Sequence, residues 1–273
     1  MDDTRMKPGV CAGMDMVAPE IIPVGRGRAC VYTRRRPGRE TANEDALAVI
    51  PGADGCCVLA VADGLGGLPA GDDASRTLLT LLSDSVAGRQ GEVQREAVLS
   101  GLEQANDAIL ANGKGGASTV AVVAIDGAVM RTSIVGDSMV VVCGQRGKIK
   151  YQSVPHSPVG YAEASGMLDE DEAMFHDDRH LVSNVVGMNG MHVEVGPLLR
   201  LSPRDTVILG SDGLFDNLYV DEVVDIARCG PLVAAAERLA DACSERMTAE
   251  LSGKPHKPDD LSFIIYRQQA DNR

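Results

Sequence analysis

The sequence predicts an α+β fold in which antiparallel sheets are covered by helices. Apolar segments with strand periodicity come as neighbouring pairs with short connections, such as 119–125 and 129–135, which Asp126-Gly127 joins in a pair suited to a type I′ turn. Segments with helical periodicity are grouped in pairs between the strands, an order that argues against a βαβ fold. A layered sandwich is the simplest arrangement that buries these apolar faces.

The chain divides into an N-terminal segment and one domain. Residues 1–24 show no sustained period and are expected to form an irregular arm, although 17–24 could pack on the domain. Residues 25–273 show no internal repeat and no break in composition, so we expect a single domain. Strands are expected, in order, around Val31 and Thr33 and at 46–50, 56–62, 119–125, 129–135, 140–143, 148–152, 192–195, 206–209 and 261–266.

Helical spacing of apolar residues is clearest in two pairs of segments. The first pair covers 78–86 and 98–109, and Gly88 and Gly113 mark the ends of its helices. The second pair covers 221–228 and 232–247. Between the pairs, 153–190 is polar and irregular with short helical pieces. Insertions of this length are usually functional.

Composition excludes several classes of function. The 273 residues carry 26 Lys and Arg against 39 Asp and Glu, and the net charge of -13 would repel nucleic acids and anionic membranes at long range. The chain is 44% hydrophobic and 24% charged, which is typical of a globular protein. Trp is absent and 3% of residues are aromatic, so the core must be built mainly from aliphatic side chains.

The cysteines and the N-terminus indicate a soluble cytoplasmic protein. Seven cysteines show no CxxC pair and no regular disulfide spacing, so we expect reduced core thiols. No segment reaches the roughly 18 uninterrupted apolar residues of a membrane span, and the acidic start Met1-Asp2-Asp3 is unlike a signal peptide. We therefore expect no membrane and no nucleic-acid partner.

Acidic residues stand at the ends of five expected strands. Taken singly, each has an ordinary explanation, because Asp-Gly is a common turn and Asp a common cap. If the strand ends share one edge of the sheets, the carboxylates form an oxygen-rich pocket that suits hard divalent cations such as Mg²⁺ or Mn²⁺. The five groups are Glu44-Asp45, Asp63-Gly64, Gly136-Asp137-Ser138, Ser211-Asp212-Gly213 and Asp259-Asp260.

Six ordered motifs, which cover about residues 40–267, resemble those of the type-2C, metal-dependent (PPM) serine/threonine phosphatases, with a bacterial-like pattern. Chance agreement of six motifs in order is far less expected than a lone match. The motifs are Asn43-Glu44-Asp45, the segment from Ala62-Asp63-Gly64-Leu65 to Gly71 and Ala74-Ser75, Gly116-Ala117-Ser118-Thr119, Val135-Gly136-Asp137-Ser138, the segment from Ser211-Asp212-Gly213 to Asp216, and Pro258-Asp259-Asp260.

The resemblance implies a four-layer α-β-β-α sandwich, with two mainly antiparallel sheets flanked by helices and a catalytic domain over residues 25–273. It also implies two divalent cations, Mn²⁺ or Mg²⁺, at one edge of the sheets, and a third, weaker site. The implied roles are Asp63 between both ions, the Gly64 carbonyl on one, Asp212 and Asp259 on the other, Glu44 and Asp45 on metal-bound waters, and Asp137 at the third site. Asp260 stands where the family often has Asn, and we prefer Asp259 as the ligand.

The expected chemistry is hydrolysis by a water that bridges the two ions, with Asp63 and Asp212 as the residues that carry catalysis through the metals. Some relatives place a proton-donating histidine where this chain has Leu65, so we expect a metal-bound water to donate instead. His156 resembles a histidine that opens the family's flap, the insertion at 153–190, but a hydrogen-bonded loop histidine is the favoured interpretation.

A phosphate-binding arginine is expected among the six arginines between Gly25 and Glu40. Family members often carry it three residues before the Asn of the first motif, where this chain has Glu40. Arg39 or Arg34 is expected to replace it, and a solvated strand edge is an equally weighted alternative.

The resemblance implies a protein-serine/threonine phosphatase that acts as a monomer on phosphoserine and phosphothreonine proteins, the products of a serine/threonine kinase. Two alternatives stay open: a catalytically silent phosphoprotein-binding regulatory module with the same fold, and a phosphomonoesterase for small molecules. The presence of Asp63, Asp212 and Asp259 favours the enzyme. A plain calcium-binding protein is least favoured, because no EF-hand spacing is present.

Overall fold

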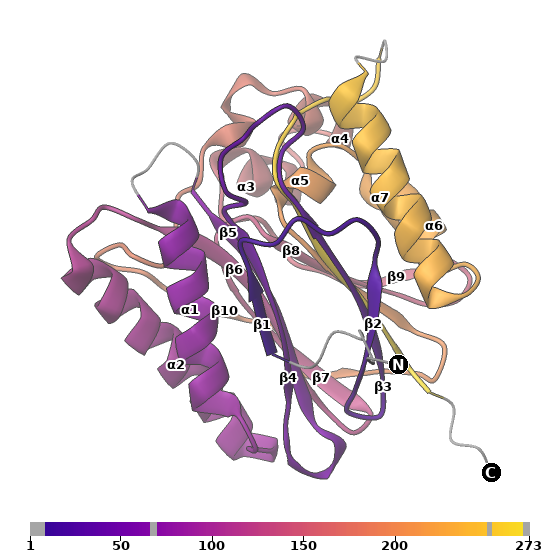
Figure 1. Ribbon diagram of the computed structural model, residues 1–273. Helices are drawn as coiled ribbons and strands as arrows, with labels where there is room; N and C mark the ends of the chain where they lie inside the picture. Colours follow the sequence, from indigo (N-terminus) through magenta and orange to yellow (C-terminus); the bar gives the residue numbers. More distant parts are fainter. Residues whose placement is uncertain (1–8, 66–69, 250–252, 270–273) are drawn as a thin grey trace.

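Two stacked antiparallel sheets form the centre of the computed structural model, which describes residues 9–65, 70–249 and 253–269 (Figure 1). The first sheet contains, in spatial order, β1 (Gly9–Ala12), β4 (Asp45–Pro51), β5 (Cys57–Gly64), β6 (Ser118–Asp126), β7 (Val129–Val135) and β10 (Glu194–Val195), with β11 (Leu199–Arg200) also paired to β7. The second contains β2 (Glu20–Val24), β3 (Gly27–Arg34), β13 (Leu261–Gln268), β12 (Thr206–Gly210), β8 (Met139–Cys143) and β9 (Ile149–Gln152).

Helices cover the outer face of each sheet, which confirms the expected four-layer sandwich. The pair α1 (Gly71–Val86) and α2 (Gly91–Asn112) packs on the first sheet, and α6 (Val220–Ala227) and α7 (Leu232–Thr248) pack on the second (Figure 1). The short helix α5 (Asp212–Phe215) directly follows β12 and was not expected from the sequence. Among the described residues, no helix combines the length and apolar character that crossing a bilayer requires.

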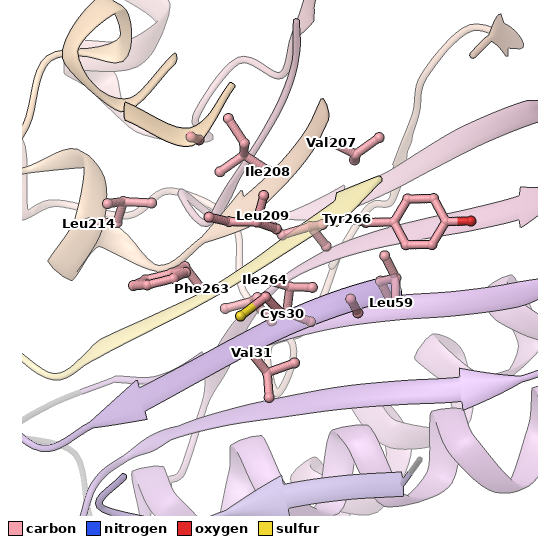
Figure 2. Close-up of a cluster of buried hydrophobic side chains, with 14 of the residues drawn as sticks. Cys30, Val31, Leu59, Val207, Ile208, Leu209, Leu214, Phe263, Ile264 and Tyr266 are labelled. Carbon is pink, nitrogen blue, oxygen red and sulfur yellow. The ribbon is translucent and has the colours of Figure 1, made fainter. Parts of the chain in front are cut away.

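The apolar run in β5 shows why this strand does not alternate between apolar and polar residues. Leu59 and Val61 face the second sheet, whereas Val58 and Ala60 face α1 and α2. Because helices cover one face and a sheet covers the other, both sets of side chains are buried. Figure 2 shows part of the core between the sheets, in which Leu59 belongs to one cluster with Ile264 and Tyr266 of β13.

The prediction of an irregular arm at 1–24 is wrong for two segments of this range, which form strands. β1 pairs with residues 46–49 of β4, and β2 pairs with residues 27–31 of β3. Ile22 in β2 is fully buried. Both segments are short strands at sheet edges, whose pairing depends on partners tens of residues away, so their local sequence carries a weak signal. Residues 1–8 lie outside the described residues.

The turn between β6 and β7 also differs from the expectation. Asp126 pairs with Val129, so the two-residue loop is Gly127-Ala128. Gly127 has a φ of 57°, whereas Ala128 does not adopt a positive φ, and a type I′ turn requires both. The type I′ prediction is therefore wrong, although the hairpin itself is present.

The insertion at 153–190 contains short helices joined by irregular segments, as expected. These are α3 (Pro158–Ala164), α4 (Glu170–Met174) and the 3₁₀ helix η2 (Asp177–His180); a second 3₁₀ helix, η1 (Ala53–Gly55), precedes β5. Ser157 caps α3 by accepting from Gly160 N at 2.9 Å, and Asp169 with Glu172 forms a capping box on α4. We refer to residues 153–190 as the flap.

Candidate metal centre

The carboxylates that the sequence places at strand ends share one edge of the sandwich. Asp45 and Asp63 are direct partners across antiparallel β4 and β5, so their side chains lie on the same face. Asp212 follows the end of β12 and Asp137 precedes the start of β8, and these two strands pair with each other up to that end. Asp259 precedes β13, which begins beside the end of β12.

Burial and mutual repulsion disfavour ionisation of these carboxylates. Burial raises the pKa of Asp63 well above its ordinary value, and the charge of Asp45 raises it further. Burial, followed by the charge of Asp212, raises the pKa of Asp137 to about 8 and that of Asp259 to about 6. Such a group of buried carboxylates is stable in its ionised form only with compensating positive charge.

Asp45 provides an independent sign that an oxygen-binding cation suits this site. Its side chain accepts from Ser211 Oγ through Oδ2 at 2.8 Å, but Oδ1 is buried and has no hydrogen-bond partner in the described part of the chain. The nearby Ser262 hydroxyl donates to Thr33 Oγ1 at 2.7 Å and not to this oxygen. A buried, unpaired carboxylate oxygen is costly, and a cation or its bound water would satisfy it. The chemistry of the donor set therefore fits a divalent metal.

Lys257 lies among these carboxylates, and the sequence interpretation missed it. Its Nζ donates to Asp212 and, at 2.7 Å, to Asp216, and it stands 3.5 Å from Asp259 Oδ2. Burial alone would lower the Lys257 pKa, but the carboxylates outweigh burial and raise it. The ammonium in turn holds the pKa of Asp212 below its ordinary value, although burial acts in the opposite direction. The sequence feature that could have revealed Lys257 as part of this cluster is its position two residues before Asp259.

The carboxylates are near one another without forming a ready-made ligand set. Across 9–65, 70–249 and 253–269, no three Asp, Glu, His or Cys side chains are grouped as an ion would require. Lys257 occupies one carboxylate oxygen of Asp212, Oδ2. A divalent ion at Asp212 would therefore compete with this ammonium.

Asp260 has a structural task that separates it from Asp259. Its two carboxylate oxygens accept the backbone N–H groups of Arg36, at 2.6 Å, and Glu44, at 2.7 Å. These contacts tie the start of β13 to the segments around β3 and β4. With both Asp260 oxygens engaged by backbone, Asp259 is the carboxylate that faces Lys257 and Asp212.

Gly64 allows three chain segments to meet beside Asp63. Gly64 N donates to the Glu44 carbonyl at 3.1 Å, and Ser75 Oγ of α1 donates to the same carbonyl at 2.6 Å. A Cβ at position 64 would lie 2.3 Å from the Gly71 carbonyl oxygen and 2.7 Å from that of Glu44. No side chain fits there, so the glycine that follows Asp63 is required by packing whatever its carbonyl binds.

The two arginines expected near phosphate occupy different surroundings. Arg34 Nε lies 4.0 Å from Asp15 Oδ1, and the adjacent Arg35 also pairs with Asp15, at 3.0 Å. Arg39 is exposed, and its charge opposes the rise in Glu44 pKa that burial and Asp260 cause. Of the two candidates, Arg39 is therefore the one whose charge is felt in the carboxylate cluster.

His156 holds the flap to the loop that carries Asp137. Its Nδ1 accepts from Gly136 N at 3.2 Å and from Asn184 Nδ2 at 2.8 Å, so the ring proton is on Nε2, which faces Glu194 Oε2 at 3.2 Å. Burial lowers the His156 pKa. These contacts describe a neutral, hydrogen-bonded loop histidine, the interpretation that the sequence favoured.

A pocket of about 90 Å³ lies between the flap and the carboxylates. Asp137, Asp212 and Asp216 line one side of it. On the flap side stand Met174 and Arg179, whose guanidinium also donates to the His256 carbonyl at 3.1 Å. A substrate group in this pocket would contact both the flap and the carboxylate edge.

Comparison with known proteins shows which family has this arrangement. The family model described as protein phosphatase 2C matches residues 34–252. A serine/threonine phosphatase, Stp, from Listeria welshimeri is 29% identical over 199 residues, which are 68% of this chain and 77% of that protein. A probable protein phosphatase 2C from Arabidopsis thaliana is 29% identical over 196 residues, 63% of this chain and 65% of that protein.

Solved structures share the fold. The serine/threonine phosphatase of S. agalactiae superposes with a TM-score of 0.76 at 24% identity and covers 88% of this chain and 99% of its own. The catalytic domain of the phosphatase PstP, solved with two manganese ions, has a TM-score of 0.69 at 21% identity and covers 89% of this chain and 99% of its own.

Proposed function

Because the chain belongs to the protein phosphatase 2C family and is a serine/threonine protein phosphatase, we propose that it works through two divalent ions at the carboxylate edge of the sheets. When bound, Mn²⁺ or Mg²⁺ ions would activate a water for attack on phosphorus and neutralise the phosphoryl oxygens. The observation that carries this proposal is the group of buried carboxylates with raised pKa values, together with Asp45 Oδ1, which has no hydrogen-bond partner among the residues that the structure describes.

The chain's own residues have separate tasks in this proposal. Asp63, the Gly64 carbonyl, Asp212 and Asp259 would hold the two ions, and Asp63 would lie between them. Glu44 and Asp45 would orient waters on the ions. This role agrees with the half-buried Glu44 side chain and with Asp45 Oδ1, for which the described part of the chain offers no hydrogen-bond partner.

Three further groups complete the proposed site. Asp137 would serve a third, weaker ion, since it stands beside Asp212 at the same edge. Arg39 is preferred to Arg34 as the phosphate ligand, because its charge reaches Glu44. Leu65 has no proton to donate and His156 is committed to holding the flap, so the leaving alkoxide takes its proton from water.

The proposed substrates are phosphoserine and phosphothreonine in proteins, the products of a serine/threonine kinase, and the proposed form is a cytoplasmic monomer. The flap pocket would hold residues next to the phosphorylated one. One observation favours the catalytically silent module instead: Lys257 already supplies a positive charge to Asp212. Phosphate release distinguishes the two.

The test is phosphate release from a phosphothreonine peptide with Mn²⁺, with Mg²⁺ and with EDTA. We expect activity with Mn²⁺ that EDTA abolishes and added Mn²⁺ restores. Asp212→Asn should lower kcat more than about a hundredfold, since loss of residues that merely support metal ligands already costs 10–100-fold. Asp225→Asn, an exposed aspartate paired with Arg228, removes the same charge and should leave kcat unchanged. A wild-type protein inactive with both metals would refute the proposal.

A further inference from the structure

Lys257 is held in place by its backbone, which distinguishes it from a mobile surface lysine. Its N–H donates to Asn217 Oδ1 at 2.9 Å, and its carbonyl accepts from Asn217 Nδ2 at 2.8 Å. Asn217 is fully buried, and its own carbonyl accepts from Arg246 at 3.0 Å. The Lys257 side chain therefore starts from a backbone position that these hydrogen bonds fix, and its ammonium lies among Asp212, Asp216 and Asp259.

The ammonium and a divalent ion would compete for the same two carboxylates. Asp212 and Asp259 are the proposed ligands of one ion, and both face Lys257 Nζ. An ammonium within a few ångströms of a bound ion is repelled by it, and this repulsion is strong where side chains are mostly buried. Lys257 is about one-fifth exposed, so its Nζ can move toward solvent when an ion binds.

From this geometry we infer that Lys257 is a built-in competitor of the metal ion at Asp212 and Asp259 and sets how tightly that ion binds. The inference rests on the proposed metal centre. Without an ion, Lys257 holds the carboxylates together. With an ion, it must give up its contacts with Asp212 and Asp259, so part of the binding free energy is spent on its displacement.

The experiment is calorimetric titration of Mn²⁺ into the metal-stripped protein. Lys257→Met keeps much of the side-chain volume and removes the charge, and it should tighten Mn²⁺ binding at least about tenfold at one position. Lys257→Arg keeps the positive charge that repels the ion, so its Mn²⁺ affinity should stay within about threefold of wild type. Lys254→Met is the matched control: Lys254 lies 3.7 Å from Glu222, and its loss changes the net charge equally. Its Mn²⁺ affinity should equal that of wild type.

Two results would overturn the inference. One is an affinity of Lys257→Met that is equal to or weaker than that of wild type. The other is an equal gain in Lys254→Met, which would show a general charge effect. If Lys257→Met is too unstable for calorimetry, its rise in melting temperature on Mn²⁺ addition should exceed that of wild type, and an equal rise would count against the inference.

Phosphate release, measured in parallel, separates this inference from the proposed function. If wild type hydrolyses the peptide but Lys257→Met binds Mn²⁺ no more tightly, the inference alone fails. If affinity rises in Lys257→Met but neither protein releases phosphate, the proposed function alone fails. If neither protein binds Mn²⁺, both fail.

Discussion

Replacing Gly213 by alanine should damage the centre without touching a carboxylate. Gly213 follows Asp212 in the first turn of α5, and a Cβ at this position would lie 1.9 Å from the Asp260 carbonyl oxygen. Ordinary carbon–oxygen contacts begin near 3.3 Å, so the two segments must separate by roughly 1.4 Å. The separation moves Asp212 away from Asp259, which is next to Asp260 in the chain.

The expected losses follow from that displacement. Forcing a methyl group into a filled space costs about 1–3 kcal/mol of unfolding free energy. Misplacing reacting groups by about 1 Å lowers kcat about a hundredfold. Urea unfolding of the metal-stripped protein and phosphate release at saturating Mn²⁺ measure the two effects separately.

Gly144→Ala is the matched control. A Cβ there would meet Lys150 Cε at 3.6 Å and Asp205 Oδ1 at 3.8 Å, which are ordinary contacts, and the backbone does not have a positive φ. Its unfolding free energy should change by less than about 0.5 kcal/mol. Gly213→Ala and Gly144→Ala proteins that are alike in stability and in kcat would refute the close-approach argument.

Three further outcomes are expected. Burial raises the pKa of Asp137 to about 8 in the folded protein, against an ordinary value near 4 in the unfolded chain. Between about pH 4 and pH 8 the folded metal-stripped protein therefore holds a proton that the unfolded chain releases, so its unfolding free energy should fall as pH rises through this range. Urea unfolding at several pH values should show a shallower fall in Asp137→Asn. His156→Gln should cost about 1–3 kcal/mol of stability through lost flap contacts, yet leave the pH-rate profile unshifted, because His156 holds the flap and transfers no proton. Loss of a pKa from the alkaline limb of that profile, where a proton donor titrates, would contradict this. Asp260→Ala should lower the unfolding free energy by about 2–3 kcal/mol, because it leaves two backbone N–H groups without their acceptor. In calorimetry it should retain Mn²⁺ affinity better than Asp259→Ala does. The reverse order of affinities would make Asp260 the ligand.

The sequence determined the elements whose apolar pattern is local. The β5 run, the α1–α2 pair and the β6–β7 hairpin each show their periodicity within a dozen or so residues, and hydrophobic burial requires that periodicity. The order of acidic residues at strand ends was also visible in the sequence. That Asp63 and Asp212 share an edge was a condition of the sequence argument and was implied by the family resemblance, because the two residues follow strands of different sheets.

Tertiary structure alone decided what depends on distant partners. The strands β1 and β2 exist because β4 and β3 offer free edges, which the local sequence of residues 9–24 does not reveal. The direction of a loop side chain is likewise set by its surroundings. Asp260 turns toward the backbone N–H of Glu44, 216 residues away, and Lys257 turns toward Asp212, 45 residues away. Periodicity carries no information about either choice, because hydrogen bonds and charge pairing at a loop depend on which groups the fold brings within reach.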